Sequence, residues 1–211
     1  MRDLGFLVAD KNMEACLHGL FGRGGWQRSL GCGPAAVAAP DVHVAAGHHD
    51  PGLYARGDAL LRPFRGKYAH MVMMIDAQWE GSPGAQAIKG RIDSHLGAAG
   101  WSPENRLALV LDPEVDVWLW TRTDHTARAL GWGRWRDLEV PLASQAWWTP
   151  DQAKPPRPKE AAEWALRQRR KPRSSLVYRR LAESVGLGRC ADEAFVALRD
   201  ALRRWFPLEG G

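Results

Sequence analysis

Acidic residues stand where three apolar runs of this chain end. Asp10 follows residues 4–8, Asp76 follows residues 68–75, and Asp112 follows residues 106–111. Each run is short and almost wholly apolar, which is typical of a strand covered on both faces. Carboxylates at neighbouring strand ends can share Mg²⁺, because this ion prefers oxygen ligands and keeps waters for a phosphate substrate. The competing interpretation is that these acids solvate loops or cap the next helix.

Two of these acids have further carboxylates close by in the sequence. Asp76 is followed by Glu80 and Gly81, and Asp112 opens the segment Asp112-Pro113-Glu114-Val115-Asp116. Asp76 and Glu80 are therefore candidates for holding a metal ion, and Glu114 is expected to join Asp10, Asp76 and Asp112 at the same edge. The second segment has an alternative role as the cap of a helix that carries Trp118 and Trp120.

The elements that must position these acids alternate between strands and helices. Residues 41–47 offer a second strand and residues 53–64 a second helix, while Ser82 and Pro83 predict the start of another helix, with serine as its cap. Such alternation predicts an α/β domain over residues 1–130, with a parallel sheet flanked by helices. Ligands of such sheets gather at the carboxyl ends of the strands, where the acids lie.

The composition changes after this domain. Residues 131–158 are rich in tryptophan and proline and are expected to form a connector. Residues 159–211 predict a basic helical extension, with helices near residues 159–170, 175–185 and 191–206. In the last of these, Phe195, Leu198, Leu202 and Trp205 recur at helical spacing and mark its buried face.

The positive charge of the chain is concentrated in its last part. Residues 151–211 contain 14 Lys and Arg against 8 Asp and Glu, whereas residues 1–150 contain 15 against 16. Clustered arginines neutralise phosphates and give salt-dependent affinity for DNA or RNA, and exposed tryptophans can stack on bases. The candidate nucleic-acid-binding residues are Arg167, Arg169, Arg170, Lys171, Arg173, Arg179 and Arg180. The alternatives are a solvated helix end for the arginines and packing in a core for most tryptophans.

Several other classes of function find little in the sequence. The three cysteines are far apart and lack C-x-x-C spacing, and His48-His49-Asp50 is more typical of a polar loop than of a metal site. A nucleotide-binding domain is not favoured, because no G-x-G-x-x-G or G-x-x-x-x-G-K-[ST] phosphate loop is present. The start of the chain does not resemble a signal peptide, and no apolar stretch approaches the roughly 20 residues of a membrane span. A cytoplasmic protein without membrane contact is expected.

The strand ends and the tail together resemble a known family. The segments Ile75-Asp76-x-x-x-Glu80-Gly81, Pro113-Glu114-x-Asp116-x-Trp118-Leu119 and Lys171-Pro172-Arg173-Ser174-Ser175 are similar to those of small bacterial TOPRIM-like proteins. Some of these accompany phage-defence operons, and one resemblance is to a component of a methylation-associated defence system. The resemblance implies a TOPRIM-like fold over residues 4–120 and other defence-system proteins as partners.

The resemblance also implies an activity, from which this sequence departs at two places. Active TOPRIM enzymes place a glutamate after the first strand beside an Asp-x-Asp pair on a metal ion, and they cut or join phosphodiester bonds. Ala9 aligns with that glutamate, which leaves Asp10 or Glu14 as substitutes, and Gln78 replaces the second aspartate. A neutral amide is a poorer Mg²⁺ ligand than a carboxylate.

Two hypotheses therefore follow from the sequence. The first is a Mg²⁺-dependent nuclease-like protein of bacterial defence, with Glu14, Asp76 and Glu80 as candidate catalytic residues. The second is a noncatalytic adaptor subunit that binds a protein partner through the tryptophan-rich connector and nucleic acid through the basic tail.

Overall fold

The fold is described from a computed structural model, which covers residues 1–186 and 190–208. Its strands are β1 (Arg2–Val8), β2 (Val42–Val44), β3 (Tyr68–Asp76) and β4 (Arg106–Leu111). Its α-helices are α1 (Lys11–Gly22), α2 (Trp26–Leu30), α3 (His49–Leu61), α4 (Ala85–Ala98), α5 (Asp124–Ala129), α6 (Trp135–Ser144), α7 (Pro158–Gln168), α8 (Ser175–Ser184) and α9 (Glu193–Trp205). The 3₁₀ turns are η1 (Ala39–Asp41), η2 (Arg62–Phe64), η3 (Pro103–Asn105) and η4 (Val115–Leu119).

The four strands form one sheet in the order β2-β1-β3-β4, and all neighbours are parallel. This confirms the α/β fold, the parallel sheet flanked by helices and the C-terminal helical extension predicted from the sequence. The apolar runs explain the arrangement, because strands covered on both faces must be apolar throughout. Residues 71–75 of β3 are entirely buried at the centre of the sheet.

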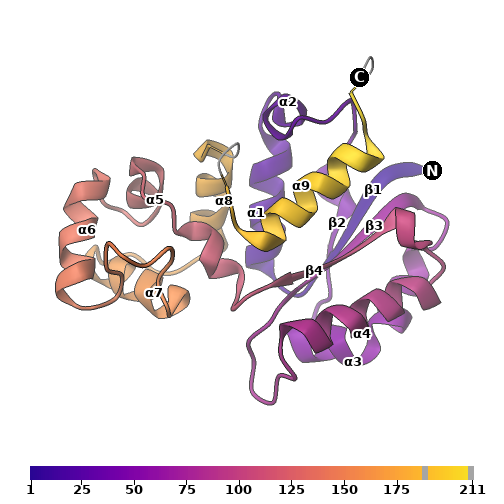
Figure 1. Ribbon diagram of the computed structural model, residues 1–211, viewed down its shortest axis with the longest axis horizontal. Coiled ribbons are helices and arrows are strands. Elements are labelled where there is room, and N and C mark those ends of the chain that lie inside the picture. The colour runs from indigo at the N-terminus through magenta and orange to yellow at the C-terminus, as the bar shows by residue number, and fades with distance from the viewer. Residues whose placement is uncertain (187–189, 209–211) are drawn as a thin grey trace.

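Helices cover both faces of the sheet. Figure 1 shows α1 and α9 on one face and α3 and α4 on the other. The apolar face of α4 consists of Ile88, Ile92 and Leu96, which are all buried. Helix α9 presents Phe195, Leu198 and Leu202 to the core, as their helical spacing predicts.

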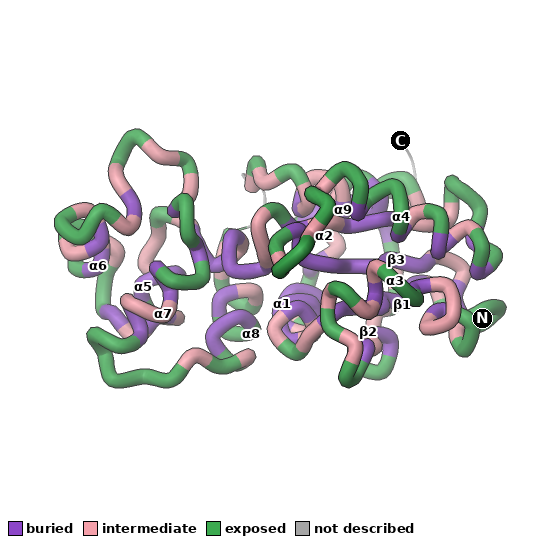
Figure 2. The backbone as a smooth tube through the Cα atoms, turned by 90° about the horizontal axis from the view of Figure 1, so that it is seen from below, coloured by how far each residue is buried: buried purple, intermediate pink, exposed green. Residues whose placement is uncertain are grey.

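A helical lobe made of α5, α6 and α7 extends the molecule beyond the carboxyl ends of the strands (Figure 1). Trp120, Trp132 and Trp148 are buried in this lobe, and each indole N–H donates to a backbone carbonyl, of Pro158, Ala165 and Gln152 respectively. Figure 2 shows the buried backbone running through the sheet and continuing into the lobe. These tryptophans are core anchors, because both the ring and its polar group are satisfied inside the protein.

The structure differs from the sequence-based expectations at several places. Helix α3 begins at His49 and ends at Leu61, whereas a helix over residues 53–64 was expected. Strand β2 comprises three residues instead of seven. Helix α4 begins at Ala85, because the Ser82 hydroxyl donates to the carbonyl of Ala77 and Gly84 occupies the cap position. Residues 131–158, expected as a connector, include α6 and much of the tryptophan core of the lobe.

Helix α8 joins the lobe to the α/β domain by packing closely on α1. A Cβ atom at Gly19 would lie 2.5 Å from the carbonyl oxygen of Arg179 and 2.8 Å from the Cβ of Ala182. Glycine is required there because the backbone of α8 occupies the space of a side chain. Gly22, at the end of the same helix, has open space around it.

Gly19→Ala is expected to destabilise the protein by about 1–3 kcal/mol, because the added methyl group overpacks the α1–α8 contact. Gly22→Ala is the matched control and should be neutral or stabilising by up to about 1 kcal/mol. Alanine lowers the conformational entropy of the unfolded chain, and the open space at residue 22 accepts its methyl group. Urea unfolding followed by circular dichroism measures both. Equal stabilities of the two variants would contradict the close approach of α8.

Candidate functional site

The strand order has its reversal point between the carboxyl ends of β1 and β3. Strand β2 lies on one side of β1, and β3 and β4 lie on the other, so the direction of the connections reverses between β1 and β3. In open parallel sheets, ligands bind at this reversal point. Val8 is in register with Met74, and Asp10 and Asp76 each follow two residues later. The two acids therefore lie near each other at the ends of these neighbouring strands, and the charge of Asp10 acts on Asp76.

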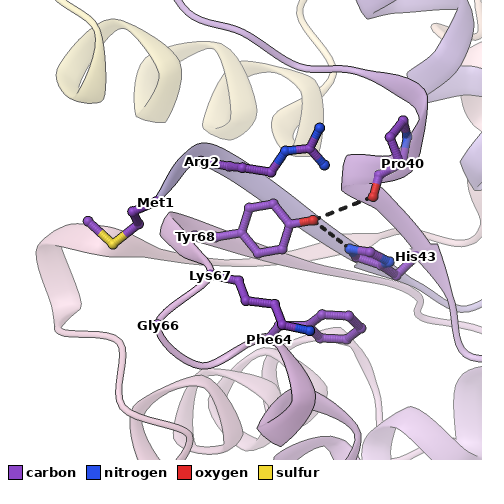
Figure 3. A pocket seen from close by; sticks show the side chains of 8 residues that line it. All are labelled: Met1, Arg2, Pro40, His43, Phe64, Gly66, Lys67 and Tyr68. Carbon is purple, nitrogen blue, oxygen red and sulfur yellow. Dashed lines mark hydrogen bonds between the residues drawn. The ribbon is translucent and has the colours of Figure 1, made fainter.

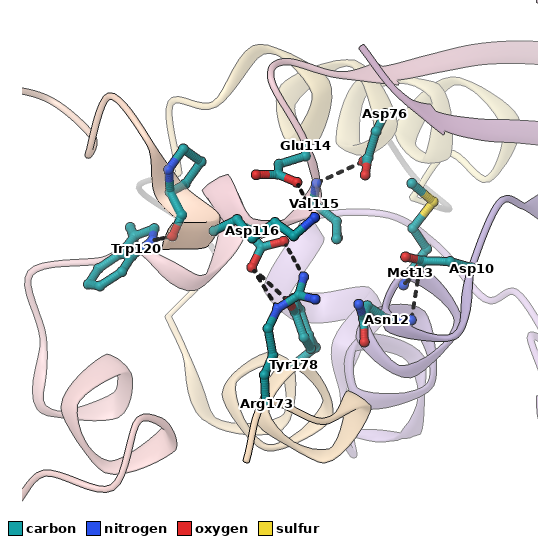
Figure 4. Close-up of polar contacts among 12 residues, drawn as sticks. Asp10, Asn12, Met13, Asp76, Glu114, Val115, Asp116, Trp120, Arg173 and Tyr178 are labelled. Atoms are coloured by element: carbon teal, nitrogen blue, oxygen red, sulfur yellow. Dashed lines mark hydrogen bonds and ion pairs between the residues drawn. The ribbon is translucent and has the colours of Figure 1, made fainter. Parts of the chain in front are cut away.

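A third acid, Asp50, joins these two from the first turn of α3. Its Oδ1 accepts a hydrogen bond of 2.8 Å from the backbone N–H of Asp76. Asp10 caps α1 by accepting from the N–H groups of Asn12 and Met13 at 2.8 and 2.9 Å. Asp76 is 8% exposed, and its Oδ1 accepts from the N–H of Val115 at 2.8 Å. We call Asp10, Asp50 and Asp76 the carboxylate cluster (Figure 4 shows Asp10 and Asp76).

The carboxylate cluster has no positive partner in the part of the chain that the structure describes, since no Lys, Arg or His nitrogen lies within 4.0 Å of its oxygens. Burial raises the pKa of Asp76 well above its usual range, and the charges of Asp50 and Asp10 raise it further. Burial also raises the pKa of Asp50, assisted by the charge of Asp10. The fold therefore favours the protonated forms of Asp50 and Asp76.

The other predicted acids do not complete a metal site. Glu14 pairs with Lys11 at 3.1 Å, and Glu80 and Asp112 are exposed. Glu114 lies 3.8 Å from Lys159, and burial, followed by the charge of Asp116, raises its pKa to about 7. Within residues 1–186 and 190–208, no three Asp, Glu, His or Cys side chains are arranged to hold one ion. Among the described residues, the predicted Mg²⁺ ligands therefore do not gather in one group of three.

A buried ion pair lies beside the cluster (Figure 4). Asp116 is 1% exposed, and its oxygens accept from Nη2 of Arg173 at 2.7 Å and from the hydroxyl of Tyr178 at 2.7 Å. Its neighbour Val115 donates to Asp76. Burial and then the charge of Asp116 raise the pKa of Tyr178, so this hydroxyl stays a donor. Arg173, which was predicted to contact nucleic acid, instead binds Asp116 and joins the segment before α8 to the segment after β4.

The other basic candidates lie where α7 ends and the chain turns towards α8. Arg167, Arg169, Arg170 and Lys171, which we call the basic turn, are all exposed. The guanidinium of Arg169 stacks on Trp132 at 3.7 Å from the ring centre. None of the four forms an ion pair with a described carboxylate.

Two candidates on α8 are separate from the basic turn. Arg179 pairs with Glu183 at 2.9 Å, whereas Arg180 is exposed on the same helix. The predicted basic residues thus divide into a free group at the turn, two residues on α8, and the structural Arg173.

Three participants in these contacts, Asp50, Asp116 and Tyr178, were not predicted as site residues, although Asp116 belongs to the acidic segment 112–116. Asp50 lies in a segment that resembles a polar loop in the sequence. The pattern that could have indicated it is an acid at the start of the helix that follows a strand. Tyr178 carries no local signal, because its partner Asp116 lies 62 residues earlier in the chain.

Searches against protein-family models, curated proteins and solved structures find no match to this chain. The TOPRIM-like resemblance therefore stays an expectation from the sequence motifs.

Asp76→Asn is expected to reduce the pH dependence of stability. A carboxyl whose pKa is raised on folding binds its proton more tightly in the folded state, so the free energy of unfolding falls as pH rises through the raised pKa. Asparagine keeps an oxygen for the Val115 N–H and carries no charge, so the fall between acidic and neutral pH should be smaller than in the wild type.

Urea unfolding at a series of pH values from acidic to mildly alkaline measures the slope of the free energy of unfolding against pH. Asp112→Asn, which changes an exposed acid on the neighbouring strand end, is the matched control and should keep the wild-type slope. An Asp76→Asn slope equal to that of the wild type would show that the surroundings do not raise the pKa of this carboxyl.

Arg173→Ala is expected to destabilise the protein by roughly 3–5 kcal/mol, because it leaves the charge of Asp116 buried without its partner. Arg170→Ala, three residues earlier and exposed, should change stability by less than about 0.5 kcal/mol. Chemical denaturation of both variants provides the comparison. Similar small effects of both changes would contradict a buried ion pair.

Proposed function

We propose that this protein binds DNA or RNA through the basic turn and acts as a noncatalytic adaptor. The observation that carries the proposal is the group of four exposed cations, at residues 167, 169, 170 and 171, without carboxylate partners in the described chain. Unpaired cations on one turn attract phosphates, and release of counterions from the nucleic acid supplies most of the binding free energy.

The basic turn is also held in place. Arg169 stacks on the buried Trp132, and the side chain of Lys171 lies against Gly131. Arg173, two residues later, is fixed to Asp116. A turn tied at both ends loses little conformational freedom on binding, which favours affinity.

The setting that we propose is a bacterial defence complex with other proteins as partners, as the sequence resemblance implies. Among the described residues, the helices are all too short or too polar to cross a bilayer. We place the protein in the cytoplasm, where its nucleic-acid ligand would be found.

A second candidate is the Mg²⁺-dependent nuclease of the TOPRIM-like resemblance. The specific observation in its favour is the carboxylate cluster, which stands at the reversal point of the sheet without a positive partner in the described part of the chain. Two observations count against it. Among the described residues, no three acidic, histidine or cysteine side chains form a group that could hold one ion. Gln78, which replaces the second aspartate of the motif, is exposed. The adaptor is therefore preferred.

Reversing two charges of the basic turn, in Arg167→Glu/Arg170→Glu, is expected to weaken binding of a fluorescent oligonucleotide at least about tenfold at low salt. The slope of log affinity against log salt should become shallower by about 2, because two phosphate contacts are lost. Fluorescence anisotropy with single-stranded DNA, duplex DNA and RNA measures both quantities.

Lys89→Glu/Arg91→Glu, which makes the same charge change on exposed residues of α4, is the control and should bind nearly as the wild type does. Equal losses in the two variants would reduce the effect to net charge and contradict a site at the turn. Cleavage of the oligonucleotide in Mg²⁺ that disappears in Asp76→Asn would favour the second candidate instead.

A further inference from the structure

A pocket of about 470 Å³ opens at the end of the sheet where the strands begin, opposite the carboxylate cluster (Figure 3). Its walls come from the start of β1, the start of β3, and the segments around η1 and η2. The residues that define its chemistry are Arg2, Pro40, His43, Phe64, Lys67 and Tyr68. Its volume falls within the range of small-molecule sites, roughly 300–1,000 Å³.

The base of the pocket is a hydrogen-bonded pair of rings. Tyr68 is 5% exposed, and its hydroxyl lies 2.8 Å from Nε2 of His43 and 3.4 Å from the carbonyl oxygen of Pro40. The ring of Tyr68 packs over Gly5, where a Cβ atom would come within 2.7 Å of it. This packing and the bond to His43 fix the tyrosine, so the polar groups of the pocket are formed in advance.

Two cations stand beside this pair. Arg2 contacts the buried Asp41 through Nη1 at 2.6 Å, and its side chain is 50% exposed. Lys67 is exposed and has no carboxylate partner in the described chain. Burial lowers the pKa of His43, and the charges of Lys67 and Arg2 oppose its protonation further, although Asp41 acts in the other direction. Two cations against the one carboxylate of Asp41 leave a net positive charge beside the ring pair, which favours an anionic ligand.

The remaining wall is aromatic. His43 stacks on Phe64 with 4.2 Å between ring centres, and Lys67 lies 6.0 Å from the centre of the Phe64 ring. Rings together with cations suit a ligand that has a flat apolar part and a negative group. A phosphate monoester carries a charge of about −1.5 to −2 at neutral pH and accepts several hydrogen bonds, which two cations can satisfy better than one.

We propose that this pocket binds a mononucleotide, with its phosphate at the unpaired Lys67 and its base against the aromatic wall of Phe64 and His43. The site uses no glycine-rich phosphate loop, which is why the sequence motifs do not indicate it. It is independent of the basic turn, which lies beyond the other end of the sheet (Figure 1).

Isothermal titration calorimetry with AMP, adenosine and inorganic phosphate tests this site. AMP is expected to bind with a Kd below about 1 mM, and adenosine and inorganic phosphate at least about tenfold more weakly, because each lacks one half of the ligand. Lys67→Glu should abolish AMP binding, and Tyr68→Phe should weaken it. Lys89→Glu, an equal charge change on α4, should leave it unchanged.

The absence of AMP binding to the wild type would overturn the site, as would equal binding of AMP and adenosine, or AMP binding that survives Lys67→Glu. Thermal unfolding of each variant verifies that it is folded. Arg167→Glu/Arg170→Glu should retain AMP binding, so failure of this site and failure of the basic turn can be distinguished.

Discussion

The arrangement of this protein depends on the burial of one charge, the carboxylate of Asp116. Removing a carboxylate from water costs several kcal/mol, which only well-placed partners can offset. Arg173 and Tyr178 provide these partners through contacts of 2.7 Å each. They belong to the chain leading into α8 and to α8 itself, so compensation of this charge fixes where the second half of the protein meets the sheet.

The same contact links the carboxylate cluster to the basic turn. Val115, next to Asp116, donates to Asp76 and thereby orients a member of the carboxylate cluster. Arg173 ends the segment that carries the basic turn.

The sequence predicts what depends on local pattern. The apolar run 68–75 identified the central strand, and the three- and four-residue spacing in α9 identified its buried face. The acids at the ends of the first and central strands were expected at one edge of the sheet, because parallel strands end together. The structure places Asp10 and Asp76 at that edge.

What the sequence could not predict depends on contacts between distant segments. Arg173 looks like its basic neighbours in the sequence. Asp116 is 57 residues away in the chain, and only the fold shows that the two side chains lie within hydrogen-bonding distance. The start of α4 was placed too early, because the Ser82 side chain bonds backwards to Ala77. The pocket at Tyr68 joins residues from three segments, of which none has a distinctive motif.

Hydrogen exchange of the full chain with and without a bound oligonucleotide tests the central claim most directly. The account predicts slower exchange of the backbone amides of residues 167–171 and 173 in the complex, with little change at the start of β1 and β3. Protection confined to the carboxyl ends of the strands, or an unchanged pattern at the turn under conditions where the oligonucleotide is bound, would contradict it.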